Sequence, residues 1–405
     1  MVKVEQQKSA GGNIIRGACL IMARIAYVDH SYHQKTLSNQ FLSDILRRHG
    51  HTVDFFWDDT WNHGQGIEFD KVANYDAIIM FQACCFPKNQ YYRLKHDNVI
   101  HIPMFDQFGI HRGGVENFCD YWESFQGCKI LSFSTAVHSI ATFFGLRSFH
   151  TRYYQPPESL NSIPHEGLHG FFWLRHEKHV SWPLVRKLIA NTRFDSLHIH
   201  IAPDPHTPQP TLPTYEEVAR YNITTSTWFA DKQDFLKVLK RANVFFAPRA
   251  EEGIGQSFLE ALARGQCVVA RDNGTMNEYI THGINGLLYS AEDPKPLDFS
   301  NIYELGRNAL RSVEAGYDRW QAQEKRLVDF ILTPSPALYK GYYQHAPLAK
   351  EKNTKTLAET SLSMILPPIP LRQRLRERWI FRKTQRLWRP IWRLVKPFIA
   401  PDVSN

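Results

Sequence analysis

Two carboxylates eight residues apart are the strongest chemical feature of the sequence. Glu252 lies in a loop, and Glu260 lies in a segment (257–264) that is rich in helix formers. The apolar run 243–247, which ends at Pro248, predicts a buried strand before the loop. Glu260 follows Glu252 by a span equal to about two helical turns, which places it on roughly the same side. We therefore expect the two carboxylates to flank one ligand site.

The loop itself has the composition of an anion-binding turn. Gly253 and Gly255 allow the backbone to approach a ligand closely. Backbone N–H groups at a strand-to-helix turn point outward with the positive end of the helix dipole behind them, which suits a diphosphate. A nearby carboxylate can accept two hydrogen bonds from vicinal hydroxyls. The residues that we predict to bind the ligand are Gly253, Ile254, Gly255, Gln256, Ser257 and Glu260.

The segment from Ala247 to Tyr289 resembles the retaining glycosyltransferases built from two Rossmann-like halves, the GT-B type. The resemblance is to the glycosyl transferases group 1 family, marked by Glu-x7-Glu followed by Glu-Ala-x-Ala-x-Gly, which corresponds here to Glu252 and to Glu260–Gly265. It implies that Glu252 holds donor-sugar hydroxyls and that Glu260 holds the ribose of the nucleotide. Taken alone, Glu252 is more readily explained as a loop charge before a helix and Glu260 as a solvated helix charge, whereas the ordered set of residues favours the site.

Two cations follow the strand that is predicted at 170–174. The resemblance implies that Arg175 and Lys178 bind the donor diphosphate and act with Glu252 in catalysis. Their spacing departs from the family pattern, so it stays open which of the two corresponds to the family's diphosphate-binding cation. Both residues could also be solvated charges of the loop.

The acceptor side has weaker signals. Where the family has glycines after the first strand, this chain has Asp29-His-Ser-Tyr-His-Gln34, and where the family often has a histidine it has Met104-Phe-Asp-Gln107. We expect acceptor-side contacts from His30, His33, Asp106 and His111. No motif supports them, and a chain with 19 histidines places some in loops by chance.

Alternating strand and helix patterns predict an α/β fold with two doubly wound Rossmann-like domains that face a cleft. The expected boundaries are 1–22 for an N-terminal extension, 23–165 for an acceptor domain, 166–345 for a nucleotide-sugar domain, and 346–405 for a linker and tail. Prolines at 156, 157 and 164 mark the interdomain linker. Cysteine spacing shows no paired metal motif, which indicates reduced thiols in a cytoplasmic protein.

The basic excess of the chain lies in its last 35 residues. Eight Arg and two Lys against one Glu and one Asp in 371–405 leave a net charge of +8, which equals that of the whole chain. On a helix, the Trp, Phe and Leu residues fall opposite the basic ones, which is typical of an interfacial membrane helix. We expect segment 371–399 to bind an anionic membrane surface, and hence a peripheral location at the inner face of the membrane. Packing on the first domain is a competing interpretation, and nucleic-acid binding is the third and weakest one.

These features together predict transfer of a hexose-type residue from a nucleoside diphosphate sugar to an acceptor with retention of anomeric configuration. The acceptor would be a glycan or glycolipid, such as a lipid-linked surface polysaccharide or lipopolysaccharide. The sequence lacks an Asp-x-Asp motif, so we expect no metal and no cofactor besides the nucleotide sugar as co-substrate. The alternatives are a sugar-nucleotide epimerase and a non-catalytic sugar-nucleotide-binding subunit.

Overall fold

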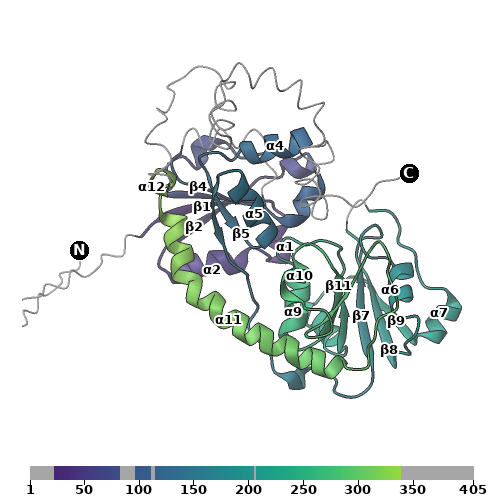
Figure 1. The fold of residues 1–405 in the computed structure, drawn as a ribbon. Coiled ribbons are helices and arrows are strands. Elements are labelled where there is room, and N and C mark those ends of the chain that lie inside the picture. The colour runs from purple at the N-terminus through teal and green to yellow at the C-terminus, as the bar shows by residue number, and fades with distance from the viewer. Residues whose placement is uncertain (1–21, 83–95, 111–114, 205–206, 339–405) are drawn as a thin grey trace, which may run out of the picture.

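The computed structural model describes residues 22–82, 96–110, 115–204 and 207–338, which form two α/β units (Figure 1). The first unit has a six-stranded parallel sheet in the order β2-β1-β3-β4-β5-β6. Its elements are β1 (Arg24–Asp29), α1 (His33–Thr36), α2 (Gln40–Arg48), β2 (Thr52–Trp57), β3 (Ala77–Phe81), β4 (Val99–Ile102), α4 (Val115–Glu123), β5 (Lys129–Ser132), α5 (Thr135–Phe143) and β6 (Arg147–His150).

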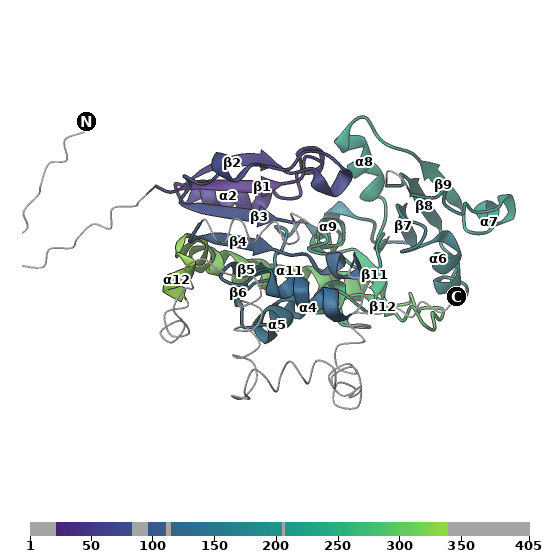
Figure 2. The same cartoon turned by 90° about the horizontal axis from the view of Figure 1, so that it is seen from above.

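The second unit has another six-stranded parallel sheet, in the order β12-β11-β10-β7-β8-β9. Figure 2 shows the strands of the two units as separate groups. The elements are β7 (His169–Leu174), α6 (Trp182–Leu188), β8 (Ser196–Ile201), α7 (Tyr215–Arg220), β9 (Ile223–Ser226), α8 (Lys232–Leu239), β10 (Val244–Phe246), α9 (Gln256–Ala263), β11 (Cys267–Arg271), α10 (Met276–Tyr279), β12 (Leu287–Tyr289), α11 (Ile302–Leu332) and α12 (Ser335–Leu338). The predicted fold class of two doubly wound Rossmann-like units is confirmed.

The central strands are apolar because helices cover both faces of each sheet. Every residue of β3 and β10 is buried, as expected for parallel strands packed on both sides. The sequence pattern does not predict β6, β9, β11 and β12 as strands, and three of these, β6, β9 and β12, are only three or four residues long. The residues of β6 are only half-buried and those of β9 are largely exposed, so neither carries a buried strand's apolar run.

Helix α11 joins the two units. The sequence predicts a helix from 315 to 332 that closes the second unit, whereas the structure has 31 helical residues that begin at Ile302 and end against the first sheet (Figure 1). There, the buried Lys129 Nζ donates hydrogen bonds to the carbonyls of Phe330, Ile331 and Thr333 at 2.5 to 2.9 Å. These bonds satisfy carbonyls that a helix end leaves open.

A carboxylate from the second unit caps a helix of the first. Ser134 caps α5 through its own hydroxyl, as the sequence predicts. Glu278 adds bonds from across the interface, because its carboxylate accepts from Ser134 Oγ at 2.9 Å and from Thr135 N at 2.8 and 2.9 Å. The sequence suggests equally a cap and a ligand for Glu278; the structure makes it a cap, on a helix of the other unit.

The predicted tail at 346–405, the proposed membrane segment 371–399 and the N-terminal extension up to residue 21 lie outside the described residues. No helix among the described residues has the length and apolar character needed to cross a membrane.

Candidate functional site

The chain reverses its strand order in the second sheet between β7 and β10, which lie side by side. In doubly wound sheets, ligands bind outside the carboxyl ends of the strands at such a switch point. Arg175 directly follows β7, and the loop 247–255 that contains Glu252 follows β10. Two predicted catalytic residues therefore lie at the position where this topology favours a ligand.

The two loop glycines are required by contacts within the protein. Gly255 precedes α9 with φ of +73°, and a Cβ there would lie 2.1 Å from a ring carbon of Phe258. A Cβ on Gly253 would lie 2.6 Å from the side chain of Met104, which follows β4 of the first unit. Glycine at 253 therefore lets the two units meet. Ligand approach to this backbone stays a prediction.

Glu252 is a buried acid whose pKa is influenced by both arginine and aspartate side chains. Only 8% of the residue is exposed. Burial raises the pKa of Glu252 to about 7; the guanidinium groups of Arg249 and Arg175 oppose this increase, and the carboxylates of Asp106 and Asp204 reinforce it. At neutral pH the carboxyl can therefore both donate and accept a hydrogen bond, and either role suits a sugar hydroxyl.

Two arginines lie beside Glu252, and each is paired with an aspartate. Arg249 Nη1 lies 3.5 Å from Asp106 Oδ2 across the interface, and Arg175 Nε donates to Asp204 Oδ1 at 2.7 Å. Burial alone would lower the pKa of Arg249, but the carboxylates of Glu252, Asp106 and Asp204 outweigh it and raise that pKa. Arg249 and Asp204 are not among the residues predicted from the sequence. Arg249 directly follows the predicted strand and Pro248, and Asp204 lies in a proline-rich loop after β8.

Buried polar atoms in this cluster lack protein partners. Asp106 Oδ1, Arg249 Nε and His179 Nδ1 have no hydrogen-bond partner among the described residues. His176 packs against His179 with ring centroids 4.5 Å apart. Burial lowers the pKa of His179 to about 4, with Arg249 and His176 adding to the effect. Buried polar groups are rarely left unpaired, so this set marks a place where a polar ligand would complete the bonding.

The other predicted donor residues have different surroundings. Gln256 bridges the units, because its Nε2 donates to Ser38 O at 3.3 Å and its Oε1 accepts from Gln155 Nε2 at 2.6 Å. Glu260 is partly exposed and lies 3.9 Å from Arg264 Nη1. Lys178 is exposed and forms no ion pair with any described residue. Ile254 is buried and Ser257 is half-buried, and the donor contacts of all five stay predictions.

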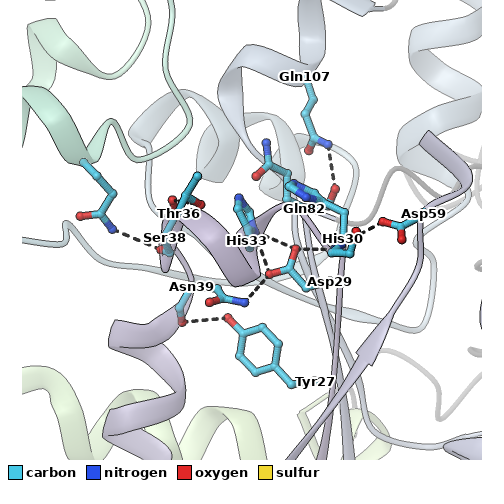
Figure 3. A network of polar contacts seen from close by, with 12 residues as sticks. Tyr27, Asp29, His30, His33, Thr36, Ser38, Asn39, Asp59, Gln82 and Gln107 are labelled. Carbon is cyan, nitrogen blue, oxygen red and sulfur yellow. Dashed lines mark hydrogen bonds and ion pairs between the residues drawn. The ribbon is translucent and has the colours of Figure 1, made fainter. Parts of the chain in front are cut away.

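On the acceptor side, the structure brings His30 and His33 together after β1, with ring centroids 3.9 Å apart (Figure 3). Asp106 lies with the Glu252 cluster instead, through its pair with Arg249. His111 lies outside the described residues. Asp29 is not among the predicted site residues, and its carboxylate lies within hydrogen-bond distance of His33 Nδ1.

Ligand-type atoms of Asp29, His30 and His33 lie within 4.8 Å of one another, a spacing that a metal ion could bridge. Both oxygens of Asp29 already accept hydrogen bonds from N–H donors, among them Asn39 Nδ2 at 2.6 Å and His30 N at 2.8 Å. The carboxylate is thus satisfied by the protein, and the prediction that no metal is needed stays untested.

Similarity to known proteins in sequence lies within the second unit, and similarity in structure extends over both units. Residues 174–300 match the family model described as glycosyl transferases group 1. No curated protein sequence matches the chain. The structure is similar to the sucrose-phosphate synthase of Thermosynechococcus elongatus, with a TM-score of 0.56, 14% identity, and coverage of 76% of this chain and 98% of that one.

It is also similar to Anabaena HepE in complex with UDP-glucose, with a TM-score of 0.51, 13% identity, and coverage of 76% of this chain and 99% of that one. At these identities the likeness concerns the fold. The chain therefore has the GT-B fold of its glycosyltransferase neighbours, and its second unit carries the group 1 glycosyl transferase segment.

Proposed function

We propose that the protein transfers a sugar from a nucleoside diphosphate sugar to a glycan or glycolipid acceptor, with retention of anomeric configuration. The observation that carries this proposal is the placement of Glu252 beside Arg175 and Arg249 at the switch point of the second sheet. The segment that matches the group 1 model, 174–300, includes all three.

The chemistry follows from the charges. Cleavage of the bond between sugar and diphosphate leaves negative charge on the leaving phosphate, so donors fixed near that phosphate stabilise the transition state. Arg175, Arg249 and the N-terminal end of α9 supply such donors. Asp106 and Asp204 hold the two guanidinium groups, and a diphosphate would take over part of that pairing. Glu252 would bind hydroxyls of the donor sugar.

We also propose that these cations replace a divalent metal. Two guanidinium groups and a helix N-terminus provide positive charge without one. Activity that persists at full rate in EDTA is expected. Activity that disappears in EDTA and returns with Mg²⁺ or Mn²⁺ would contradict metal independence but not sugar transfer.

The first test is a thermal-shift panel on the full chain with UDP, GDP, ADP, CMP, dTDP and their sugars. UDP-glucose comes first, because the HepE structure contains it. One nucleotide should raise Tm, and Glu260→Ala should remove that shift if Glu260 binds the ribose. The matched control is Glu314→Gln on the exposed side of α11, which should keep the shift. No shift with any nucleotide would contradict the proposal.

Product analysis separates the alternatives. A glycosyltransferase releases the nucleoside diphosphate from the donor that shifts Tm, whereas an epimerase returns a nucleotide sugar with an altered sugar. A non-catalytic binding subunit shifts Tm but changes no donor. The anomeric proton signals of the product in NMR report retention or inversion.

For the tail, we propose peripheral attachment to an anionic membrane through 371–399. Each basic residue near an anionic surface contributes about 1 kcal/mol, and salt weakens the attraction. The full chain should cosediment with vesicles that contain phosphatidylserine, less so at high salt, and not with neutral vesicles. Equal recovery with both vesicle types would contradict charge-based attachment. A lipid-linked acceptor at the cytoplasmic face is the corresponding proposal for substrate.

A further inference from the structure

The first sheet has a switch point of its own, between β1 and β3, which pair directly. The chain that leaves β1 carries Asp29, His30 and His33, and Gln82 follows β3. These side chains gather at the carboxyl ends of the two strands (Figure 3), where ligands bind in folds of this type. Neither the group 1 segment nor the Glu252 cluster includes them.

Asp29 fixes the tautomer of His33. The Asp29 carboxylate is fully buried and accepts from His30 N at 2.8 Å and from Asn39 Nδ2 at 2.6 Å. His33 Nδ1 lies 2.9 and 2.8 Å from its two oxygens (Figure 3). A carboxylate that receives these bonds acts as an acceptor, so His33 Nδ1 carries the proton. The Nε2 atom of a neutral His33 then has a free lone pair and accepts a hydrogen bond.

Aromatic rings continue from His33 to the surface. The rings of His30 and His33 lie tilted to each other with centroids 3.9 Å apart, and Trp61 lies 5.3 Å from His30 between ring centroids. Trp61 is 49% exposed. Burial lowers the pKa of His30, and the neighbouring His33 adds to this effect. His30 Nδ1 is buried without a partner among the described residues.

A short chain of contacts connects Gln82, at the end of β3, to the donor loop. Gln107 Nε2 donates to the carbonyl of Gln82 at 3.2 Å, and Gln107 Oε1 accepts from Met104 N at 2.9 Å. The Met104 side chain in turn lies against Gly253, next to Glu252. A ligand at His33 would therefore lie on the first-unit side of the proposed donor site.

We propose that His33 binds a hydroxyl group of a carbohydrate acceptor through Nε2, with the acceptor ring packed on Trp61 and with Asp29 as the positioning residue. This inference rests on the proposed sugar transfer. A sugar ring has an apolar C–H face and a rim of hydroxyls, which is the combination that an exposed indole beside a fixed hydrogen-bond acceptor recognises. Acceptor binding is thereby assigned to residues of the loop after β1, the position at which the group 1 family has glycines.

The test compares two acceptors in the full chain, with the donor that the nucleotide panel identifies. Water is the first, measured as donor hydrolysis. The second is a panel of octyl β-D-glucoside, galactoside and mannoside, measured as glycoside product. His33→Ala should raise the KM for the glycoside about tenfold or more, as expected for a lost hydrogen bond to a substrate hydroxyl. Donor hydrolysis and the nucleotide thermal shift should stay within about twofold of wild type.

Three further variants test whether a change in the glycoside KM arises from the hydrogen bond of His33. His33→Gln should recover part of the glycoside KM, because its amide oxygen can accept the same hydrogen bond. Asp29→Asn should raise that KM as well, since its amide no longer fixes Nδ1 as the protonated nitrogen. His165→Ala, an exposed histidine in the segment between the two sheets, is the control and should leave every constant unchanged. If Asp29→Asn does not fold, the His33 variants decide.

Each contrary outcome has a distinct meaning. A wild-type glycoside KM in His33→Ala would overturn the assignment, and so would equal losses of nucleotide binding and transfer, which indicate a structural role. Zn²⁺ or Co²⁺ binding that requires His33 would replace the hydroxyl site with a cation site. Wild-type donor hydrolysis without transfer to any glycoside would overturn the carbohydrate class. If wild type neither binds nucleotides nor hydrolyses a donor, the proposed function itself fails.

Discussion

Replacing Glu252 by glutamine separates the effect of this carboxyl on stability from its effect on transfer. Burial raises the pKa of Glu252 from 4.5 to about 7 in the folded protein. Between these two pH values the unfolded chain loses the proton while the folded chain keeps it. Stability therefore falls as pH rises through this window, and the full loss is present above pH 7.

The size of the effect follows from the same pKa. One factor of ten in acid dissociation corresponds to about 1.4 kcal/mol, so the increase to about 7 corresponds to about 3 kcal/mol of lost stability above pH 7. Glutamine is neutral at every pH and does not incur this loss. Glu252→Gln should therefore be more stable than wild type by about 3 kcal/mol at pH 8 and nearly equal to it at pH 4.5.

Thermal unfolding of both proteins between pH 4.5 and 8 tests the magnitude. The variant should gain several degrees in Tm relative to wild type as pH rises, given about 2 to 4 °C per kcal/mol for domains of this size. At pH 8 the same variant should transfer sugar about a hundredfold more slowly, if Glu252 binds the sugar in the transition state. The exposed Glu314→Gln should show neither change. A Tm difference that does not vary with pH would refute the reasoning about burial.

Two further predictions concern the loop and the interface. Gly255→Ala should lower the free energy of unfolding by about 2 to 4 kcal/mol, because its Cβ would clash with Phe258 at a positive φ. The control Gly283→Ala has a similar φ and open space around its Cβ, so it should lower this free energy by only about 1 kcal/mol. Equal losses for the two variants in denaturant titrations would exclude the clash as the cause. Glu278→Gln should lower the free energy of unfolding by about 1 to 2 kcal/mol in the same assay, because it weakens the charged cap on Thr135. An unchanged free energy of unfolding would show that this cap does not contribute to stability.

Local patterns explain why the predicted elements agree with most of the structure. The apolar run after Asn243, the loop glycines and the helix formers after Ser257 are neighbours in the chain, so their signal does not depend on what packs against them. The sequence places β10 at 243–247 and the helix at 257–264, and the structure has Val244–Phe246 and Gln256–Ala263. Edge strands such as β9, with largely exposed residues, leave no comparable pattern.

The sequence by itself determined the fold class, the strand-loop-helix element that carries Glu252, and the cations at the end of β7. Only the tertiary structure decided which charges surround that carboxyl. Asp106 and Asp204 reach it from the segments that follow β4 and β8, Met104 of the first unit packs on Gly253, and Asp29 fixes the tautomer of His33. The physical reason is that periodicity and turn chemistry act between neighbours in the chain, whereas burial, pKa and ion pairing depend on groups that only the folded chain brings within a few ångströms.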